Sequence, residues 1–318
     1  MRATRRTDEA AGSGRAAVTN LECTDGVAIY ALDAAVIVPA RNCANTVGRQ
    51  LAALAAQDFA GTWELLVVDN GSTDTTGSVA RAWSERFPVS MTVLDCPRPG
   101  VNRARNAGAR VARGKVLAFC DGDDEAASGW LTAIVAATHS ADLVGGRLDE
   151  TSLNSTHRRA LRPHFVQGQL PVALGHLDFA PGANLAIGKT SLALLGGFDE
   201  AFTLGHDDVD LSFRAHQAGL RLGWAGDAVV AYRHREGGWR LFCQFVRYGR
   251  AEPLLYRHHR SCGLPRTKVL HALRRWTSLL PRLPRALINE EARGAWLVTA
   301  GSSLGRCFGS IEHRSLYL

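Results

Sequence analysis

The segment Val116-Leu-Ala-Phe-Cys-Asp-Gly-Asp-Asp124 joins a short apolar run to a turn that carries three carboxylates. Residues 116–119 have the length and the continuous apolar character of a buried strand. Asp121, Asp123 and Asp124 follow at the point where this strand is expected to end. In open α/β sheets, ligands bind outside the carboxyl ends of the strands. The segment therefore predicts a parallel sheet with a ligand site at this edge.

The same alternation extends on both sides of this segment. Other apolar runs have the character of buried strands, and the stretches between them space their apolar residues as amphipathic helices do. The strands are expected at residues 35–38, 65–68 and 91–94, and the helices at residues 45–57, 75–87 and 102–112. Alternating strands and helices predict an α/β fold with a right-handed, doubly wound, mostly parallel sheet.

Two other predicted strands end in polar turns that would lie at the same edge. Pro39-Ala-Arg-Asn42 follows the first strand, and Asp69-Asn-Gly-Ser-Thr-Asp74 follows the second. Asp69 and Asn70 offer acceptors and donors that suit a nucleobase or a ribose, so we assign them to ligand contact. The rest of the second turn is rich in residues that cap helices, and we assign it to capping.

The three carboxylates of the acidic turn would repel one another unless a cation neutralises them. Mg²⁺ and Mn²⁺ take oxygen ligands, usually one or two carboxylates together with water and phosphate oxygens of a substrate. We therefore expect one of these ions at residues 121–124. The alternative is a solvated acidic turn that caps a helix expected to start near Ala127.

Residues 179–234 contain a second acidic pair, Asp207 and Asp208, before a stretch with helical spacing. A carboxylate is a common cap at this position. Because Asp210 follows, the acids exceed what capping needs, and we interpret the pair as the source of a general base that takes a proton from an acceptor hydroxyl. His234 closes an apolar strand and is a candidate metal ligand or diphosphate contact, with a structural histidine as the alternative.

Two arginines, Arg103 and Arg105, lie near the start of the helix expected at residues 102–112. The amino end of a helix favours anions. We expect one of the two to contact a nucleotide, and the alternative is that both are simply exposed.

The composition of this 318-residue chain is that of a globular protein and also indicates its compartment. Seven cysteines are scattered without a CxxC pair, so we expect no disulfide framework and a reducing, cytoplasmic setting. No run of 18 uncharged apolar residues occurs, so no membrane span is expected. Residues 1–33 are expected to be a flexible leader, because polar residues rather than an apolar stretch follow their arginines.

The basic character of the chain belongs to its C-terminal part. Residues 231–318 hold 16 Lys and Arg against 5 Asp and Glu, whereas residues 1–230 hold 21 against 25. We expect residues 237–318 to form a separate helical appendage, with Pro281 and Pro284 interrupting its helices. Arginines and aromatic residues at 239–260 predict peripheral contact with the inner membrane face or with an anionic, lipid-linked acceptor. A solvated face is the alternative, and nucleic acid is not expected because no nucleic-acid motif accompanies the charge.

Eight motifs, taken in order, closely resemble the inverting family 2 glycosyltransferases with the GT-A fold. They are Val36-Ile-Val-Pro-Ala-Arg-Asn42, Leu66-Val-Val-Asp-Asn-Gly-Ser-Thr-Asp74, Ala104-Arg-Asn-Ala-Gly108, Phe119-Cys-Asp-Gly-Asp-Asp124, Gly182-Ala-Asn184, Gly196-Gly-Phe-Asp-Glu200, Asp207-Asp-Val-Asp-Leu211 and His234. The resemblance covers residues 35–235 and implies a catalytic domain at residues 34–236. The implied reaction moves a sugar from a nucleotide-diphosphate sugar, a UDP-sugar above all, to an acceptor hydroxyl in cell-envelope, glycolipid or secondary-metabolite glycosylation.

The resemblance also implies a role for each matching position. The nucleotide contacts would be Pro39, Ala40, Asn42, Asp69, Asn70, Arg105 and Asp121. Asp123 would bind the metal together with His234, Asn184 and Asp124 would lie near the sugar and the acceptor, and Asp208 would be the base with Asp207 beside it. Two positions depart from the family pattern, because Asn70 replaces the second acid of the usual Asp-Asp-Gly-Ser and Asp207 replaces the Glu of the usual Glu-Asp pair.

Two other functions compete with this interpretation. A sugar-phosphate nucleotidyltransferase would normally carry a Gly-rich, Lys- or Arg-containing loop after the first strand, where this chain has Pro39-Ala-Arg-Asn42. A non-catalytic protein that binds anionic surfaces would use the basic C-terminal region and leave the acidic turns without a role.

Overall fold

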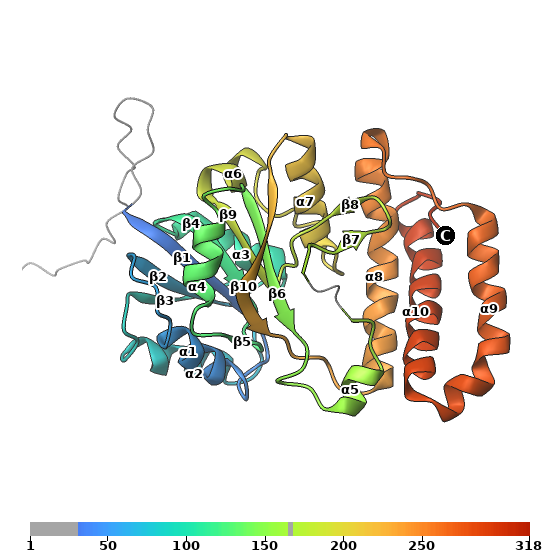
Figure 1. Ribbon diagram of the computed structural model, residues 1–318, viewed down its shortest axis with the longest axis horizontal. Coiled ribbons are helices and arrows are strands. Elements are labelled where there is room, and N and C mark those ends of the chain that lie inside the picture. The colour runs from blue at the N-terminus through green and yellow to red at the C-terminus, as the bar shows by residue number, and fades with distance from the viewer. Residues whose placement is uncertain (1–30, 165–167) are drawn as a thin grey trace, which may run out of the picture. The chain divides into compact units, whose positions relative to one another are not determined.

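A computed structural model describes residues 31–164 and 168–318. Its centre is an eight-stranded sheet with the order β3-β2-β1-β4-β9-β6-β10-β5 (Figure 1). The strands are β1 (Leu32–Ala40), β2 (Trp63–Asp69), β3 (Met91–Asp95), β4 (Gly114–Cys120), β5 (Glu125–Ala126), β6 (Leu143–Asp149), β9 (Asn184–Gly188) and β10 (Leu222–Ala231). Strands β3, β2, β1 and β4 are parallel neighbours. The predicted doubly wound, mostly parallel α/β sheet is confirmed.

The second half of the sheet contains the antiparallel pairings. Strand β9 runs antiparallel to both β4 and β6, and β10 pairs parallel with β6 and antiparallel with β5. A separate hairpin is formed by β7 (Val172–Ala173) and β8 (Leu177–Asp178). Strands β6 and β9 were not among the predicted strands, because Gly145 and Gly146 interrupt the apolar run of β6.

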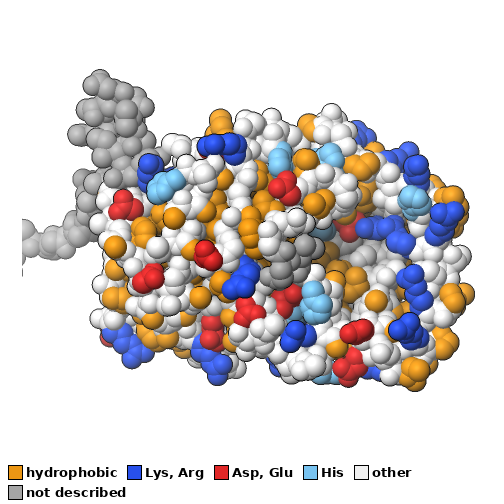
Figure 2. Space-filling view, viewed as in Figure 1, with side chains coloured by type: hydrophobic (Ala, Val, Ile, Leu, Met, Phe, Trp, Pro, Cys, Tyr) orange, Lys and Arg blue, Asp and Glu red, His pale blue; other side chains and the backbone are white. Residues whose placement is uncertain are grey.

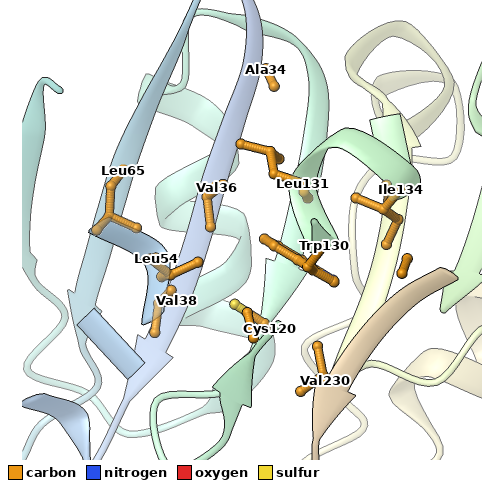
Figure 3. Packing of buried hydrophobic residues seen from close by; sticks show 14 of the residues in the cluster. Ala34, Val36, Val38, Leu54, Leu65, Cys120, Trp130, Leu131, Ile134 and Val230 are labelled. Atoms are coloured by element: carbon orange, nitrogen blue, oxygen red, sulfur yellow. The ribbon is translucent and has the colours of Figure 1, made fainter. Parts of the chain in front are cut away.

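Helices cover both faces of the sheet. They are α1 (Val47–Ala55), α2 (Thr76–Ser84), α3 (Val101–Val111), α4 (Trp130–Ala137), α5 (Thr156–Ala160), α6 (Lys189–Leu194) and α7 (Asp207–Gln217). The alternation of side chains along β1 separates two cores: Val36 and Val38 pack with α1, α2 and α4, whereas Ala35 and Ile37 pack with α3, α6 and α7. Figure 3 shows the first core, in which the wholly buried Trp130 lies between β4 and β10.

The N-terminal part of the predicted leader, residues 1–30, lies outside the described residues. Strand β1 begins at Leu32, so the last two residues assigned to the leader, Leu32 and Asp33, belong to the sheet.

The C-terminal helices are α8 (Gly238–His259), the short 3₁₀ helix η1 (Arg260–Cys262), α9 (Val269–Ile288) and α10 (Glu290–Glu312). They differ from the separate appendage that we predicted, because α8 shares a core with α7. Phe213 and Val209 of α7 pack with Leu254 and Leu255 of α8. His259 of α8 also contacts Asp210 of α7 through a buried Nε2–Oδ1 pair of 2.9 Å.

Two prolines that were expected to interrupt the C-terminal helices lie inside α9. Pro281 and Pro284 each remove a backbone donor, which would break an isolated helix. Leu279 and Ala286, on either side of these prolines, are buried where α9 packs against α10. Tertiary packing therefore maintains the helix across two positions where the sequence alone favours its end.

Helices α8 and α10 approach each other closely through glycines. A Cβ atom at Gly305 of α10 would overlap the carbonyl oxygen of Val246, and one at Gly249 of α8 would overlap that of Ser302. Gly309 meets the backbone of Arg250 in the same way. We call this contact between α8 and α10 at Gly249, Gly305 and Gly309 the glycine seam. Its backbone-to-backbone contacts hold α10, and with it α9, on the rest of the molecule.

We expect Gly305→Ala to lower the free energy of unfolding by about 1–3 kcal/mol, because the added methyl group forces the two helices apart. Gly48→Ala is the matched control, since a Cβ there would meet only Trp83 Nε1 at an ordinary 3.6 Å. Alanine in place of a helical glycine with free space should stabilise by about 0.5–1 kcal/mol. Denaturant unfolding of both variants measures the difference, and equal stability of the two would contradict the close approach of α8 and α10.

No helix within residues 31–164 and 168–318 combines the length and the apolar character that a membrane crossing requires.

Candidate functional site

The carboxyl ends of three neighbouring parallel strands bring the predicted turns together. The register pairs Ala40 of β1 with Asp69 of β2, and Ile37 of β1 with Phe119 of β4. Pro39 and Ala40, two of the predicted nucleotide contacts, therefore lie at the same edge as the acidic turn. This is the edge where ligands bind in open α/β sheets.

The turn after β2 is held by hydrogen bonds among the predicted ligand residues. Asn42 accepts from the Thr73 backbone N–H at 2.8 Å through Oδ1, and Asp69 accepts from the Ser72 N–H at 3.0 Å. Asn70 is buried, and its Oδ1 accepts from the Gly100 N–H at 2.7 Å. Each of these oxygens orders a loop at the rim of the site, and contact of these residues with a nucleotide stays a prediction.

The acidic turn places three carboxylates where they are able to share a cation. Ligand oxygens of Asp121, Asp123 and Asp124 all lie within 4.8 Å of one another. Asp124 is 1% exposed, and its Oδ1 accepts from the Arg233 N–H at 2.7 Å, but its buried Oδ2 has no hydrogen-bond partner among the residues that the structure describes. A buried carboxylate oxygen without a donor is costly unless a cation or a proton compensates it. The donor set therefore fits a hard divalent cation such as Mg²⁺ or Mn²⁺.

Burial raises the pKa values of this cluster. It raises the pKa of Asp121 to about 6, against the opposing effect of the Arg105 guanidinium. The pKa of Asp124 lies well above its usual range because of burial and then of repulsion by Asp123 and Asp121. Burial is the main cause of both shifts, and repulsion between the neighbouring carboxylates adds to it.

Arg105 lies between this cluster and the second acidic pair. It is 3% exposed, and its guanidinium contacts Asp207 through Nη1, Asp121 through Nη2 at 3.3 Å, and the Gly182 carbonyl oxygen through Nη2 at 3.1 Å. Burial alone would lower the pKa of Arg105, but the carboxylates, Asp207 first, raise it. Arg105 thus forms a buried ion pair with both acidic segments, and its contact with a nucleotide stays a prediction.

Arg103, the other candidate from the same helix, faces outward. Its Nε donates to Glu200 Oε2 at 2.9 Å, and both side chains are largely exposed. Contact of one of these two arginines with a nucleotide therefore stays a prediction.

The two acids at the start of α7 have different environments. Asp207 is buried and paired with Arg105. Asp208 is half-buried, and its Oδ2 accepts from the Gly182 N–H at 2.8 Å while its Oδ1 accepts from the Val209 N–H at 2.9 Å. Within residues 31–164 and 168–318, Asp208 forms no ion pair. Asp207 is thus paired with a cation, whereas the Asp208 carboxylate is oriented by two backbone N–H groups.

Asn184, the predicted sugar contact, is fully buried and its amide is engaged by the protein. Its Oδ1 accepts from Trp130 Nε1 at 2.8 Å, and its Nδ2 donates to the carbonyl oxygens of Arg147 and Ala228 at 2.9 and 2.8 Å. The side chain therefore ties β9 to β6, β10 and α4. Both N–H bonds of the Asn184 amide are thus used by the protein, and its contact with the sugar or the acceptor stays a prediction.

His234 is buried and lies three residues after the end of β10. Its Nε2 lies 3.1 Å from Glu150 Oε1, an ion-pair distance without hydrogen-bond geometry, and its ring packs edge-on against Tyr232. The set of candidate metal ligands at residues 121–124 consists of Asp121, Asp123 and Asp124 and does not include His234. A metal-binding role for His234 stays a prediction.

Two residues that support the site were missed in the sequence. Gln50 of α1 is wholly buried, donates to the Asp121 carbonyl oxygen at 3.0 Å and accepts from the Ala126 N–H at 2.9 Å. Arg233 donates through Nε to the Asp123 carbonyl oxygen at 2.9 Å and pairs with Glu125 at 3.1 Å. Nothing in the sequence marks a helical glutamine such as Gln50 as a residue that supports the site. Arg233 could have been suspected, because it directly precedes the candidate His234.

Known proteins with similar sequences are glycosyltransferases. The profile of a family described as "Glycosyl transferase family 2" matches residues 35–193. The chain is 30% identical over 269 residues to glycosyltransferase AglE of Haloferax volcanii, covering 83% of this chain and 86% of the relative. It is 28% identical over 258 residues to a validoxylamine A glucosyltransferase of Streptomyces hygroscopicus subsp. jinggangensis, covering 69% of this chain and 61% of the relative.

Solved structures share the fold. Mannosyltransferase PcManGT from Pyrobaculum calidifontis, in complex with GDP-Man and Mn²⁺, superposes with a TM-score of 0.61 at 21% identity and covers 86% of this chain and 87% of that one. S. aureus TarS 1–349 in complex with UDP-GlcNAc gives a TM-score of 0.52 at 18% identity, covering 90% and 93%. The GT-A fold predicted from the motifs is confirmed.

Proposed function

The chain belongs to glycosyl transferase family 2, so it is an enzyme that uses a nucleotide sugar, and we propose that it transfers the sugar to an acceptor hydroxyl by a single inverting displacement. The observation that carries this proposal is the difference between Asp207 and Asp208. A general base must be able to take up a proton. Asp207 forms a buried ion pair with Arg105, whereas the Asp208 carboxylate accepts, among the described residues, only from the backbone N–H groups of Gly182 and Val209.

The residues divide into two groups around the reacting bond. Asp121, Asp123 and Asp124 would hold a Mg²⁺ or Mn²⁺ ion, which when bound neutralises charge on the departing diphosphate. Asp208 accepts the proton of the acceptor hydroxyl as that oxygen attacks the anomeric carbon from the face opposite the diphosphate. Arg105 positions both groups, because one guanidinium contacts Asp121 and Asp207. No enzyme nucleophile is required, and no covalent intermediate is expected.

The donor nucleotide is the first property to test. The two solved neighbours were crystallised with different donors, GDP-Man and UDP-GlcNAc. We propose a UDP-sugar, and a thermal-shift and hydrolysis screen of UDP-, GDP- and dTDP-sugars with Mn²⁺ present tests this choice. A shift with GDP-sugars alone would correct the nucleobase without changing the assignment of the reaction.

We expect Asp123→Asn to abolish the Mn²⁺-dependent stabilisation by nucleoside diphosphate, because it removes the exposed carboxylate of the cluster. The melting temperature of the ligand-free protein should change little. Asp227→Asn is the control, since Asp227 is an exposed acid of β10 away from the acidic turn. Thermal shifts with UDP and Mn²⁺ measure the effect, and unaltered Mn²⁺ dependence in Asp123→Asn would refute the assigned ligand.

A further inference from the structure

Helix α9 exposes an apolar stripe along its whole length. The large side chains on it are Val269 (52% exposed), Leu273 (56%), Trp276 (40%), Leu280 (78%), Leu283 (39%) and Leu287 (68%). They recur at alternating intervals of four and three residues, which places them on one side of a helix. Leu270 and Ile288, at 57% and 86% exposed, widen the stripe at its two ends.

A neighbouring face of α9 is already covered. Ala272, Leu279 and Ala286 recur every seven residues and are buried. The Trp296 Nε1–H of α10 donates to the Leu279 carbonyl oxygen at 3.0 Å, so this flank faces α10. The exposed stripe is therefore a second apolar surface, separate from the one that holds the helix in place.

The charge around this stripe has a single sign. Between Glu252 and Glu290 the chain contains no acidic residue. The same segment carries Arg257, Arg260, Arg266, Lys268, Arg274, Arg275, Arg282 and Arg285. Figure 2 shows Lys and Arg side chains interspersed with apolar ones at the edge of the molecule formed by the C-terminal helices.

The surface that the sequence had suggested for membrane contact, on α8, is largely used inside the protein. Tyr248 packs against His206 and Gly205 at the start of α7, and its hydroxyl accepts from Gln244 Nε2 at 2.8 Å. Phe242 and Phe245 lie at the glycine seam with α10. The free apolar surface is on α9 instead.

We propose that the exposed face of α9 is a docking surface for an anionic lipid bilayer. A helix that lies in the membrane interface inserts its apolar side chains between the headgroups, and arginines at its edges contact anionic lipids. Arg274 and Arg285 are exposed on the polar side of the same helix, which is where a helix in the membrane interface carries its basic residues. The proposal concerns binding and does not depend on the assigned reaction.

A second copy of the chain fits this surface less well. Self-association of apolar stripes with this spacing is usually supported by opposite charges at the flanking positions. The positions that flank the stripe of α9 offer no such charges, because they are Leu270, Thr277, Pro284, Ala272, Leu279 and Ala286. Residues 253–289 also contain no acidic residue that could pair with the arginines of a second copy. An anionic headgroup layer complements the same charges.

The test is flotation of the full-length protein with phosphatidylcholine vesicles, with and without phosphatidylglycerol. We expect binding to the anionic vesicles that weakens with salt. The triple variant Leu273→Gln, Leu280→Gln, Leu287→Gln should reduce the bound fraction at limiting lipid by about tenfold or more. Arg274→Gln with Arg285→Gln should remove much of the preference for phosphatidylglycerol.

A matched triple variant controls for the loss of exposed apolar residues in general. Val111→Gln, Val172→Gln and Leu194→Gln change side chains that are 51%, 57% and 69% exposed on the catalytic domain, and vesicle binding should be unaffected. Melting temperatures establish that both triple variants are folded. Flotation of the α9 variant equal to that of the wild type would overturn the proposal. So would a wild-type dimer in analytical ultracentrifugation that dissociates in the α9 variant while no vesicles are bound.

Discussion

An Asp208→Asn enzyme is expected to turn over about 10²–10⁴-fold more slowly than the wild type, the range that a general base contributes. Donor affinity should remain nearly unchanged, because the base acts on the proton of the acceptor and mainly in the transition state. Asparagine keeps one acceptor oxygen, which is enough for the bond from the Gly182 N–H that holds the loop, although the bond from the Val209 N–H is lost. Turnover and donor dissociation constants, measured on the same preparations, give both quantities.

Asp207→Asn is the informative neighbour. It weakens the ion pair with Arg105 but leaves the Asp208 carboxylate intact, so a milder loss of turnover is expected, together with lower thermal stability. Glu85→Gln, a change at an exposed acid that follows α2, should be neutral. If Asp208→Asn turns over normally while Asp207→Asn does not, the base is Asp207 and the assignment from the ion pairs is wrong.

Replacing Arg105 with methionine is expected to lower the free energy of unfolding by about 3–5 kcal/mol, the usual cost of leaving a buried charge without its partner. Methionine fills much of the arginine volume but offers no donor to Asp121, Asp207 or the Gly182 carbonyl oxygen. Denaturant unfolding of the metal-free protein at neutral pH gives the loss of stability. Turnover should fall as well, since both acidic segments lose their common contact.

Arg103→Met is the control from the same helix, and it should cost less than about 1 kcal/mol because its ion pair with Glu200 is solvent-exposed. Adding Asp207→Asn to Arg105→Met removes one of the uncompensated carboxylates and should recover part of the stability. A double variant no more stable than Arg105→Met alone would show that the loss comes from packing rather than from unpaired charge.

The fold was predictable because its evidence is local. Continuous apolar strands and amphipathic helices alternate through residues 35–120, and each has a period that a short window reveals. The ends of the predicted helices differ from those of α1 and α2 by one to three residues. The antiparallel strand β9 and the α7–α8 core were not predictable in this way, since their partners lie far apart in the sequence.

The candidate site also has a part that local sequence predicts and a part that depends on residues far apart in the chain. Its acidic turns were found because carboxylates after a buried strand are a local signal. The surroundings of Arg105 and Asn184 were not, because their partners at Asp207 and Trp130 are 102 and 54 residues away. Motif matching assigned both residues to substrate, yet in the folded protein each satisfies other buried polar groups. Position in a motif indicates which edge of the sheet a residue occupies, and tertiary contacts decide what its side chain touches.

The core that α7 shares with α8 limits where this enzyme can be joined to a relative in a chimeric protein. A chimera joined near residue 237 would take away Leu254, Leu255 and His259 and leave Phe213 and Asp210 of α7 without their partners. The first residues of that helix include Asp208, so the mismatch would reach the acid assigned to catalysis. Recombination that keeps α7 and α8 from one parent, and crosses over after Gly263, preserves this core. A chimera should therefore take the catalytic domain and α8 from the same parent.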